Sequence, residues 1–382
     1  MIQLHRPFAR EAVGPDRDAI LARADQVLEQ APEALPDAPR DWGPGGPQDF
    51  YSRADYLWPD PEQPDGIPYL TRDGESNPGN FSGHRLIMRR MRNRVSDLAT
   101  AWTLSGDKKY IVKAERLLED FFLAEGRGMH PHLLHAQMVP GVDEGRGTGI
   151  IDTIHLLDVP FAIEALAQDV GATKSSLDPV LYEGLKSWFR EYLDWILYHQ
   201  HGIDEANTTN NHAVCYWLQV AVFARFTDQA EYLDLARAVY RSKLLKQMDA
   251  DGCFPLEVGR TKPYGYAFFI VDNLVSFCQA ASEVDPARPE NDLWTYALPD
   301  GRSLEQALKF FTPYLLDRAA WPYPPDVMHD ASWPTKASFM YLAGHALDKP
   351  ELVELWERLP EDRENLEVLR NLGTRAPWLW HA

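Results

Sequence analysis

Apolar residues recur at helical spacing along most of this 382-residue chain, and no segment shows the sustained alternation of a half-buried strand. The stretch from Ile87 to Trp102 places its apolar side chains on one face, and Gly106 ends it. Asp178 followed by Pro179 is typical of a helix start, with an N-cap and then a proline in the first turn. The same spacing predicts further helices at about 111–122, 179–195, 210–226, 230–248, 264–282, 304–316, 336–346 and 351–358.

Short turns separate the predicted helices, so consecutive helices are expected to pack as antiparallel neighbours. At this length, stacked helix hairpins favour an all-α, incomplete α/α toroid over a four-helix bundle. The segment from about 32 to 80 is different, because it is rich in Pro, Gly and Asp. Its many Tyr and Trp residues favour an extended, ordered segment packed over the toroid rather than a flexible linker. No domain boundary is evident, and residues 1–382 are expected to form a single domain.

The chain carries 38 basic and 57 acidic residues, which gives a formal net charge of −19. A general nucleic-acid binder needs a basic footprint, so nucleic acid is not an expected partner. The same charge repels polyanions at long range. An acidic substrate would therefore require a local cluster of Arg, His and Lys that overcomes this field.

No apolar run reaches the roughly 18 residues of a membrane span, so no membrane association is expected. The first residues, MIQLHRPFAREAVG, lack the apolar stretch of a signal peptide. The sequence as written therefore predicts a cytoplasmic protein, or a periplasmic or secreted one if a signal was removed. The three cysteines are widely spaced, which fits a fold independent of disulfides and matches no zinc motif.

The sequence Asn210-Asn211-His212 stands at the start of one predicted helix. The apolar stripe of that helix, extended backwards, reaches Asn210 and Asn211, so polar amides stand where the buried face should continue. A helix N-terminus has free N–H groups and a partial positive charge, which suits an anion. His212 adds a group that can donate or accept a proton. Either these side chains form part of an anion site, or the two amides only cap the helix.

Arg260 and Lys262 lie on the loop that enters another predicted helix, whose first turn holds Tyr264 and Tyr266. Two cations beside a tyrosine favour its phenolate, so a lowered tyrosine pKa and a role as a base are expected. The alternative is a basic surface loop beside packed tyrosines.

Three histidines, His130, His132 and His135, are close in sequence and suggest a metal site. A proline interrupts them, and their spacing does not keep all three on one helix face. Polar contacts to a ligand, or helix-end caps, are therefore favoured over a metal. The glycines around Arg146 allow a close backbone approach, but no strand precedes them and the GK[ST] ending of a phosphate-binding loop is absent.

Six short stretches of the chain, taken together and in order, resemble the alginate lyase superfamily of polysaccharide lyases, whose members are α/α toroids. The resemblance is nearest to polysaccharide lyase family 38 and more distant to family 5, and it runs from about 51 to 282. The stretches are YSRADYLWPDPEQPDGIPYLTRDGESNP, GDKKYIVKAERLLEDFF, MHPHLLHAQ, GRGTGIID, NNH and FPLEVGRTKPYGY.

The resemblance implies an active site. Asn211 and His212 match the Asn-His pair of these lyases, and Arg260 and Tyr266 match their Arg and catalytic Tyr. Arg260 and Tyr266 are one position closer together than in the family 5 pattern, which leaves Tyr264 as a less favoured rival for the base.

A Glu shortly before the Asn-His pair recurs in the nearer relatives, and Glu205 holds that place here, with a helix cap as its alternative role. The resemblance implies no metal or other cofactor. Contacts to the substrate or the lining of the cleft are expected from Glu205, Asn210, Gln137, Arg146, Tyr264, Lys262, Tyr56 and Trp58, with Tyr69 beside them.

Lyases of this kind cleave β-1,4-linked polyuronates by β-elimination. Asn211, His212 and Arg260 would neutralise the carboxylate at C5, while Tyr266 takes the C5 proton and returns it to the leaving oxygen. One residue does both only when proton and leaving group lie on the same face, as in β-D-mannuronate and β-D-glucuronate but not in α-L-guluronate. The expected partner is thus an acidic polysaccharide, polymannuronate (alginate) or glucuronan. The alternatives are a toroidal hydrolase with paired carboxylates and a non-catalytic carbohydrate-binding protein.

Overall fold

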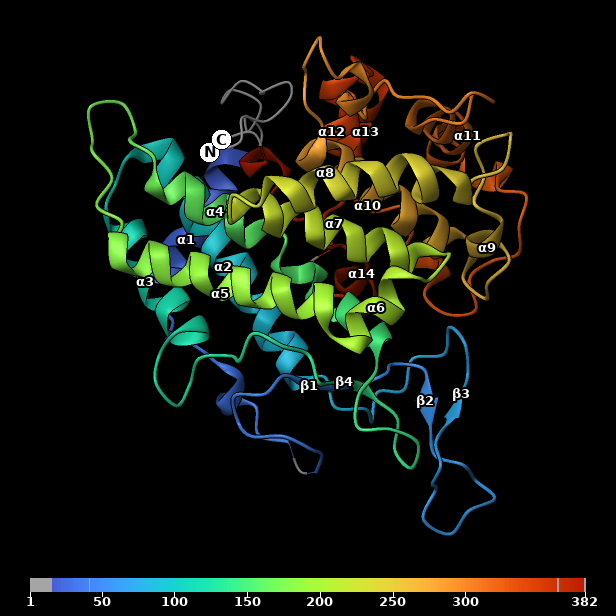
Figure 1. Ribbon diagram of the computed structural model, residues 1–382, viewed down its shortest axis with the longest axis horizontal. Coiled ribbons are helices and arrows are strands. Elements are labelled where there is room, and N and C mark those ends of the chain that lie inside the picture. The colour runs from blue at the N-terminus through green and yellow to red at the C-terminus, as the bar shows by residue number, and fades with distance from the viewer. Residues whose placement is uncertain (1–15, 41, 363, 381–382) are drawn as a thin grey trace.

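The computed structural model describes residues 16–40, 42–362 and 364–380. The first residues, in which the sequence shows no signal-peptide stretch, lie outside the described part. The described chain is mostly helical, as the apolar spacing predicts (Figure 1). The helices are α1 (Arg17–Leu28), α2 (Gly83–Ser105), α3 (Lys109–Phe122), α4 (Asp158–Ala167), α5 (Pro179–Tyr198), α6 (Gln200–Ala206), α7 (Asn211–Phe226), α8 (Ala230–Val239), α9 (Pro255–Val258), α10 (Pro263–Ala281), α11 (Leu304–Leu316), α12 (Ser338–Ala346), α13 (Pro350–Arg358) and α14 (Leu366–Asn371).

Helices that follow one another in the chain pack side by side, for example α2 with α3, α7 with α8, and α12 with α13. The helices α7 and α10 form the centre of the molecule and are buried along most of their length. In Figure 1, α7 lies between α5 and α10. The start of α5 follows its sequence signature, because Asp178 Oδ1 accepts a hydrogen bond of 2.8 Å from Val180 N and Pro179 is the first helical residue.

The helical prediction differs from the structure in several places. The helix expected at 230–248 ends at Val239, and the chain continues as a π turn, Tyr240–Leu244, and a 3₁₀ turn, Leu245–Gln247. The sequence analysis also missed α1, α4, α6, α9 and α14, together with the 3₁₀ helix Gly147–Leu156 that precedes α4. The helix α4 continues directly from this 3₁₀ helix, and no capping side chain marks its start.

The extended segment, residues 32–80, holds no α-helix in its described part. Its first strand, β1 (Tyr51–Arg53), pairs in parallel with β4 (His135–Met138). Its other strands, β2 (Leu57–Trp58) and β3 (Leu70–Thr71), pair with each other as antiparallel neighbours. All four strands lie along one edge of the molecule, beneath the helices in Figure 1.

One cluster of buried apolar side chains extends from Ala24 to Trp380. Phe50 belongs to it, so the extended segment is anchored in the same core as the helices. The three cysteines are buried and form no disulfide. No described helix combines the length and the apolar character that crossing a membrane requires.

Candidate active site

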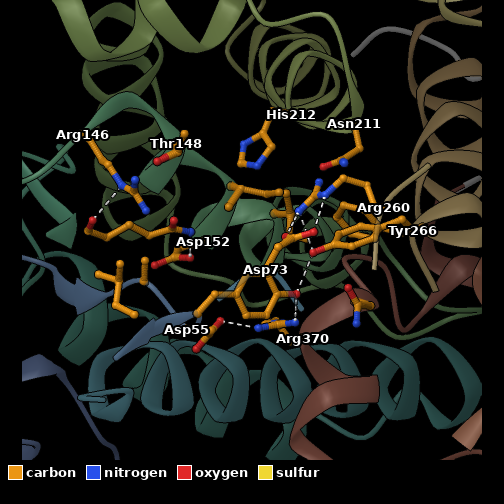
Figure 2. A pocket seen from close by; sticks show the side chains of 18 of the residues that line it. Asp55, Asp73, Arg146, Thr148, Asp152, Asn211, His212, Arg260, Tyr266 and Arg370 are labelled. Atoms are coloured by element: carbon orange, nitrogen blue, oxygen red, sulfur yellow. Dashed lines mark hydrogen bonds and ion pairs between the residues drawn. The ribbon is translucent and has the colours of Figure 1, made fainter. Parts of the chain in front are cut away.

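A cavity opens where the extended segment meets the N-terminal ends of α7 and α10 (Figure 2). Parts of the chain that are far apart in sequence form its walls, including the loop after β1, the 3₁₀ helix before α4, and α14. Its lining includes Asp55, Tyr56, Asp73, Arg89, Gln137, Arg146, Asp152, Asn211, His212, Arg260, Tyr266 and Arg370.

The amino end of α7 presents Asn211 to the cavity. Asn210 is the N-cap, and its Oδ1 accepts a hydrogen bond of 3.3 Å from His212 N. The backbone N and the side-chain Nδ2 of Asn211 each donate to one oxygen of the buried Glu257, both at 2.7 Å. The amide nitrogen carries two hydrogens, so this clamp fixes the side chain and leaves one N–H for a ligand.

His212 is oriented by a buried carboxylate. Its Nδ1 lies 2.6 Å from Oε1 of Glu205, which directs Nε2 away from Glu205. Burial lowers the pKa of His212, but the charge of Glu205 more than compensates, so the pKa is raised above its ordinary value. The charged imidazolium is therefore favoured, and it can donate a hydrogen bond to an anion in the cavity.

Arg260 joins Tyr266 to Asp73. Its guanidinium lies over the Tyr266 ring, 4.1 Å from the ring centre, and donates a hydrogen bond of 3.0 Å to the Tyr266 hydroxyl oxygen. Nε donates to Asp73 Oδ2 at 3.0 Å, and the terminal nitrogen that reaches Tyr266 also contacts the other oxygen of Asp73. Such a two-point Arg–carboxylate pair fixes the position of the cation.

A second tyrosine and a second arginine continue this chain of contacts. The Tyr266 hydroxyl donates to the hydroxyl oxygen of Tyr56 at 2.8 Å, and Arg370 donates to the same Tyr56 oxygen at 2.7 Å. Arg370 is held in turn by Asp55 and Glu367, at 2.6 Å and 2.7 Å. Two phenol oxygens in contact thus lie between two guanidinium groups.

The expected lowering of the Tyr266 pKa is wrong. Burial raises the pKa of Tyr266 well above its ordinary value, and Tyr56 adds to this rise because its oxygen accepts a hydrogen bond from the neutral Tyr266 hydroxyl. Arg260 and Arg370 offset only part of this rise. Lys262, the second cation of the expectation, pairs with Glu367 at 2.6 Å instead.

The opposite wall supplies further cations. Arg146 Nε donates to the backbone oxygen of Gln137 at 3.0 Å, and Gln137 Nε2 donates to Asp152 at 3.1 Å. Arg89 Nε donates a hydrogen bond of 2.9 Å to His155 Nε2. Burial lowers the pKa of Arg89 to about 9. The lining arginines, including Arg260 and Arg370, form the local basic cluster that an acidic substrate would require in a chain of this net charge.

Comparison with known proteins identifies the family of the chain. The sequence model of the alginate lyase family matches residues 43–321. The chain belongs to the alginate lyase family. It is accordingly a polysaccharide lyase. A search of curated proteins gave no significant match.

Solved structures of alginate lyases share the fold. An alginate lyase from Bacteroides ovatus is 28% identical, with a TM-score of 0.77 over 95% of both chains. The alginate lyase A1-III from Sphingomonas species A1 is 14% identical, with a TM-score of 0.54 over 95% of this chain and 94% of its own. A variant of A1-III in complex with a tetrasaccharide is 13% identical, with a TM-score of 0.56 over the same shares. These matches confirm the expected α/α toroid.

The cavity brings together many of the side chains that the sequence analysis singled out. Glu205 and Asn210 do not line the cavity, but both form hydrogen bonds with His212. The residues that line it are Tyr56, Gln137, Arg146, Asn211, His212, Arg260 and Tyr266.

Three other expected contacts lie outside the cavity lining. The Tyr264 hydroxyl donates to the backbone oxygen of Tyr314 at 3.2 Å. Lys262 is buried against Glu367, and Trp58 Nε1 donates to the backbone oxygen of Glu75 at 2.9 Å. Tyr69 packs against a small apolar cluster made by Ala54, Leu57 and Val139.

Several residues of the cavity lining were missed. Asp73 lies within the first quoted stretch, but the sequence analysis assigned it no role. Arg370 lies about a hundred residues beyond the last recognised stretch, and Arg89 is one of several arginines on α2. A useful signal was available for Arg89, because it is a cation on the buried face of an amphipathic helix, where an arginine needs a partner or a ligand.

Proposed function

We propose that this protein cleaves β-1,4-linked polyuronates by syn β-elimination, with Tyr266 as both base and acid. The observation that carries the proposal is the hydrogen-bonded chain Arg260–Tyr266–Tyr56–Arg370. It lines the same cavity as His212 and Asn211, so a proton carrier and donors for a carboxylate share one space (Figure 2).

The reaction begins with the carboxylate at C5 of the uronate. The imidazolium of His212 and the remaining N–H of Asn211 donate to it, which stabilises the negative charge that develops as the C5 proton leaves. The Tyr266 phenolate takes this proton, the C5–H electron pair forms the C4–C5 double bond, and the C4–O bond breaks. Tyr266 then returns the proton to the departing oxygen.

The raised pKa of Tyr266 constrains how the phenolate arises. The active form needs Tyr266 deprotonated while His212 is protonated, and this form is a minority of the enzyme at neutral pH. Arg260 donates to the phenolate oxygen, and the Tyr56 hydroxyl can rotate to donate as well once the Tyr266 proton has left. These two donors stabilise the minority form.

The same-face geometry selects the substrate. One tyrosine serves both steps when the C5 proton and the C4 oxygen lie on the same face, which holds for β-D-mannuronate and β-D-glucuronate. We therefore propose polymannuronate-rich alginate as the first substrate, with glucuronan second. Arg146 supports binding of a polymer, because its terminal nitrogens donate to none of the described residues and can pair with a neighbouring uronate.

The hydrolase alternative is disfavoured by the state of Asp55 and Asp73, two of the carboxyl groups that line the cavity. A general acid needs a raised carboxyl pKa. Although burial raises it, ion pairs with Arg85 and Arg370 bring the pKa of Asp55 far below its ordinary value. Burial likewise opposes the shift at Asp73, yet Arg260 lowers its pKa.

Ultraviolet absorbance tests the proposal, because the C4–C5 double bond conjugated to the carboxylate absorbs. The purified protein is incubated separately with polymannuronate, polyguluronate, glucuronan and polygalacturonate. Rising absorbance with polymannuronate or glucuronan, and little with polyguluronate, is expected. Reducing ends without absorbance would establish a hydrolase, and polymer binding without either product would establish a binding protein.

A further inference from the structure

A second cluster of ligating side chains lies outside the cavity, where the extended segment meets the loop before β4. Asp49, His130 and His132 each offer one ligand atom, and these atoms all lie within 4.8 Å of one another. Oδ1 of Asp49 is 2.6 Å from His130 Nδ1 and 3.3 Å from His132 Nε2. None of the three residues lines the cavity.

The backbone holds the two parts of this cluster together. His130 N donates to the backbone oxygen of Gln48 at 3.1 Å, and His132 N donates to the backbone oxygen of His130 at 2.8 Å. The carboxylate is fixed from its other side, because Gly46 N donates to Asp49 Oδ2 at 2.6 Å. Oδ1 therefore remains directed at the two imidazoles.

We propose that Asp49, His130 and His132 bind a divalent transition-metal ion of the zinc type. Two imidazole nitrogens and one carboxylate oxygen form a common ligand set for zinc, whereas calcium and magnesium prefer oxygen ligands alone. Ligand atoms at about 2.1 Å from a tetrahedral zinc lie about 3.4 Å apart. The Asp49–His132 separation already matches this value, and the His130 side chain, 48% exposed, is free to move outward by the remaining distance.

The site would act on structure rather than on the elimination itself. Asp49 lies two residues before β1, and the two histidines precede β4, so a bound ion joins the two chain segments just before they pair. Beyond this junction, Ser52 accepts a hydrogen bond of 2.9 Å from Gln137 N, and Gln137 lines the cavity. The ion would therefore stabilise the wall that carries Gln137 and Arg146.

His135 provides a matched control. The sequence grouped it with His130 and His132, but its Nδ1 contacts the backbone oxygen of Glu144 at 3.1 Å and it does not belong to the cluster. His130→Ala and His135→Ala thus each remove one histidine from the same loop region, and only the first removes a proposed ligand.

The full chain is first treated with a chelator, and zinc binding is then measured by calorimetric titration. Thermal melting is measured with and without zinc. One equivalent is expected to bind to the wild type and to His135→Ala and to raise their Tm. His130→Ala should bind zinc at least about tenfold more weakly, with no rise in Tm. Equal binding by His130→Ala and the wild type, or no binding by the wild type, would overturn the proposal. These readouts do not depend on lyase activity, so the proposal and the proposed function fail separately.

Discussion

Replacing Tyr56 with Phe isolates the contribution of the second tyrosine to proton transfer. The ring is kept, and only the hydroxyl that lies 2.8 Å from the Tyr266 oxygen is removed. Arg370 loses one acceptor but keeps its contacts with Asp55 and Glu367. The substitution therefore changes the proton chain with little disturbance of its surroundings.

The expected magnitude follows from the two states of Tyr266. With Tyr266 neutral, the variant loses an ordinary hydrogen bond, worth about 0.5–1.5 kcal/mol, and with Tyr266 ionised it loses a charge-assisted one, worth about 1.5–3 kcal/mol. The difference, about 1–1.5 kcal/mol, is the lost stabilisation of the phenolate, and it corresponds to a roughly 5- to 15-fold fall in kcat.

The assay is the initial rate of absorbance increase on polymannuronate or glucuronan over a range of substrate concentrations. Tyr264→Phe is the matched control, because it removes a buried tyrosine hydroxyl whose partner, the Tyr314 backbone oxygen, is outside the cavity. The control should keep the wild-type kcat. A Tyr56→Phe rate equal to or above that of the wild type would refute the reasoning, since Tyr56 would then act only as an acceptor that favours the neutral tyrosine.

Three further substitutions test the other roles. Tyr266→Phe should abolish turnover while substrate binding, measured by calorimetry, stays near normal; retained turnover would remove Tyr266 as the proton carrier. Arg260→Ala should lower kcat by roughly 10- to 150-fold, because the Tyr266 phenolate loses a charge-assisted hydrogen bond worth about 1.5–3 kcal/mol, and an unchanged kcat would exclude Arg260 from the site. His212→Gln should alter the pH dependence of kcat/KM. In the wild type, kcat/KM should rise with pH up to the raised pKa of His212 and then stay level until the pKa of Tyr266 is approached. In the variant, kcat/KM should rise steadily across roughly pH 6 to 9, because only the phenolate fraction of Tyr266 then changes. A plateau in the variant like that of the wild type would contradict the assigned imidazolium.

The helices were predicted from local sequence patterns. The apolar spacing located α7, α10 and α11 to within a residue or so at each end, because caps and prolines mark their boundaries. The same reasoning missed α4, because this helix continues directly from a 3₁₀ helix and no capping side chain marks its start. The short turns between the predicted helices and the length of the chain favoured a toroid, and the family resemblance implied the same arrangement.

The candidate site was predictable only where its residues belong to a short motif. Asn211, His212, Arg260 and Tyr266 lie in two recognisable stretches, and the structure brings them to one cavity. The resemblance favoured Tyr266 over Tyr264, and in the structure Tyr266 lines the cavity whereas Tyr264 does not. Arg370 could not be found in this way, since its contact with Tyr56 joins positions 314 residues apart.

The distance in sequence between Tyr56 and Arg370 has a consequence for inactivation by heat. The helix α14 that carries Arg370 has only six residues, too few to be stable alone, and ion pairs of Glu367 with Lys262 and of Arg370 with Asp55 hold it in place. Local opening of such an element requires less free energy than unfolding of the toroid. Warming should therefore abolish lyase activity at a temperature below that at which the helical circular dichroism signal is lost. The activity should return on cooling.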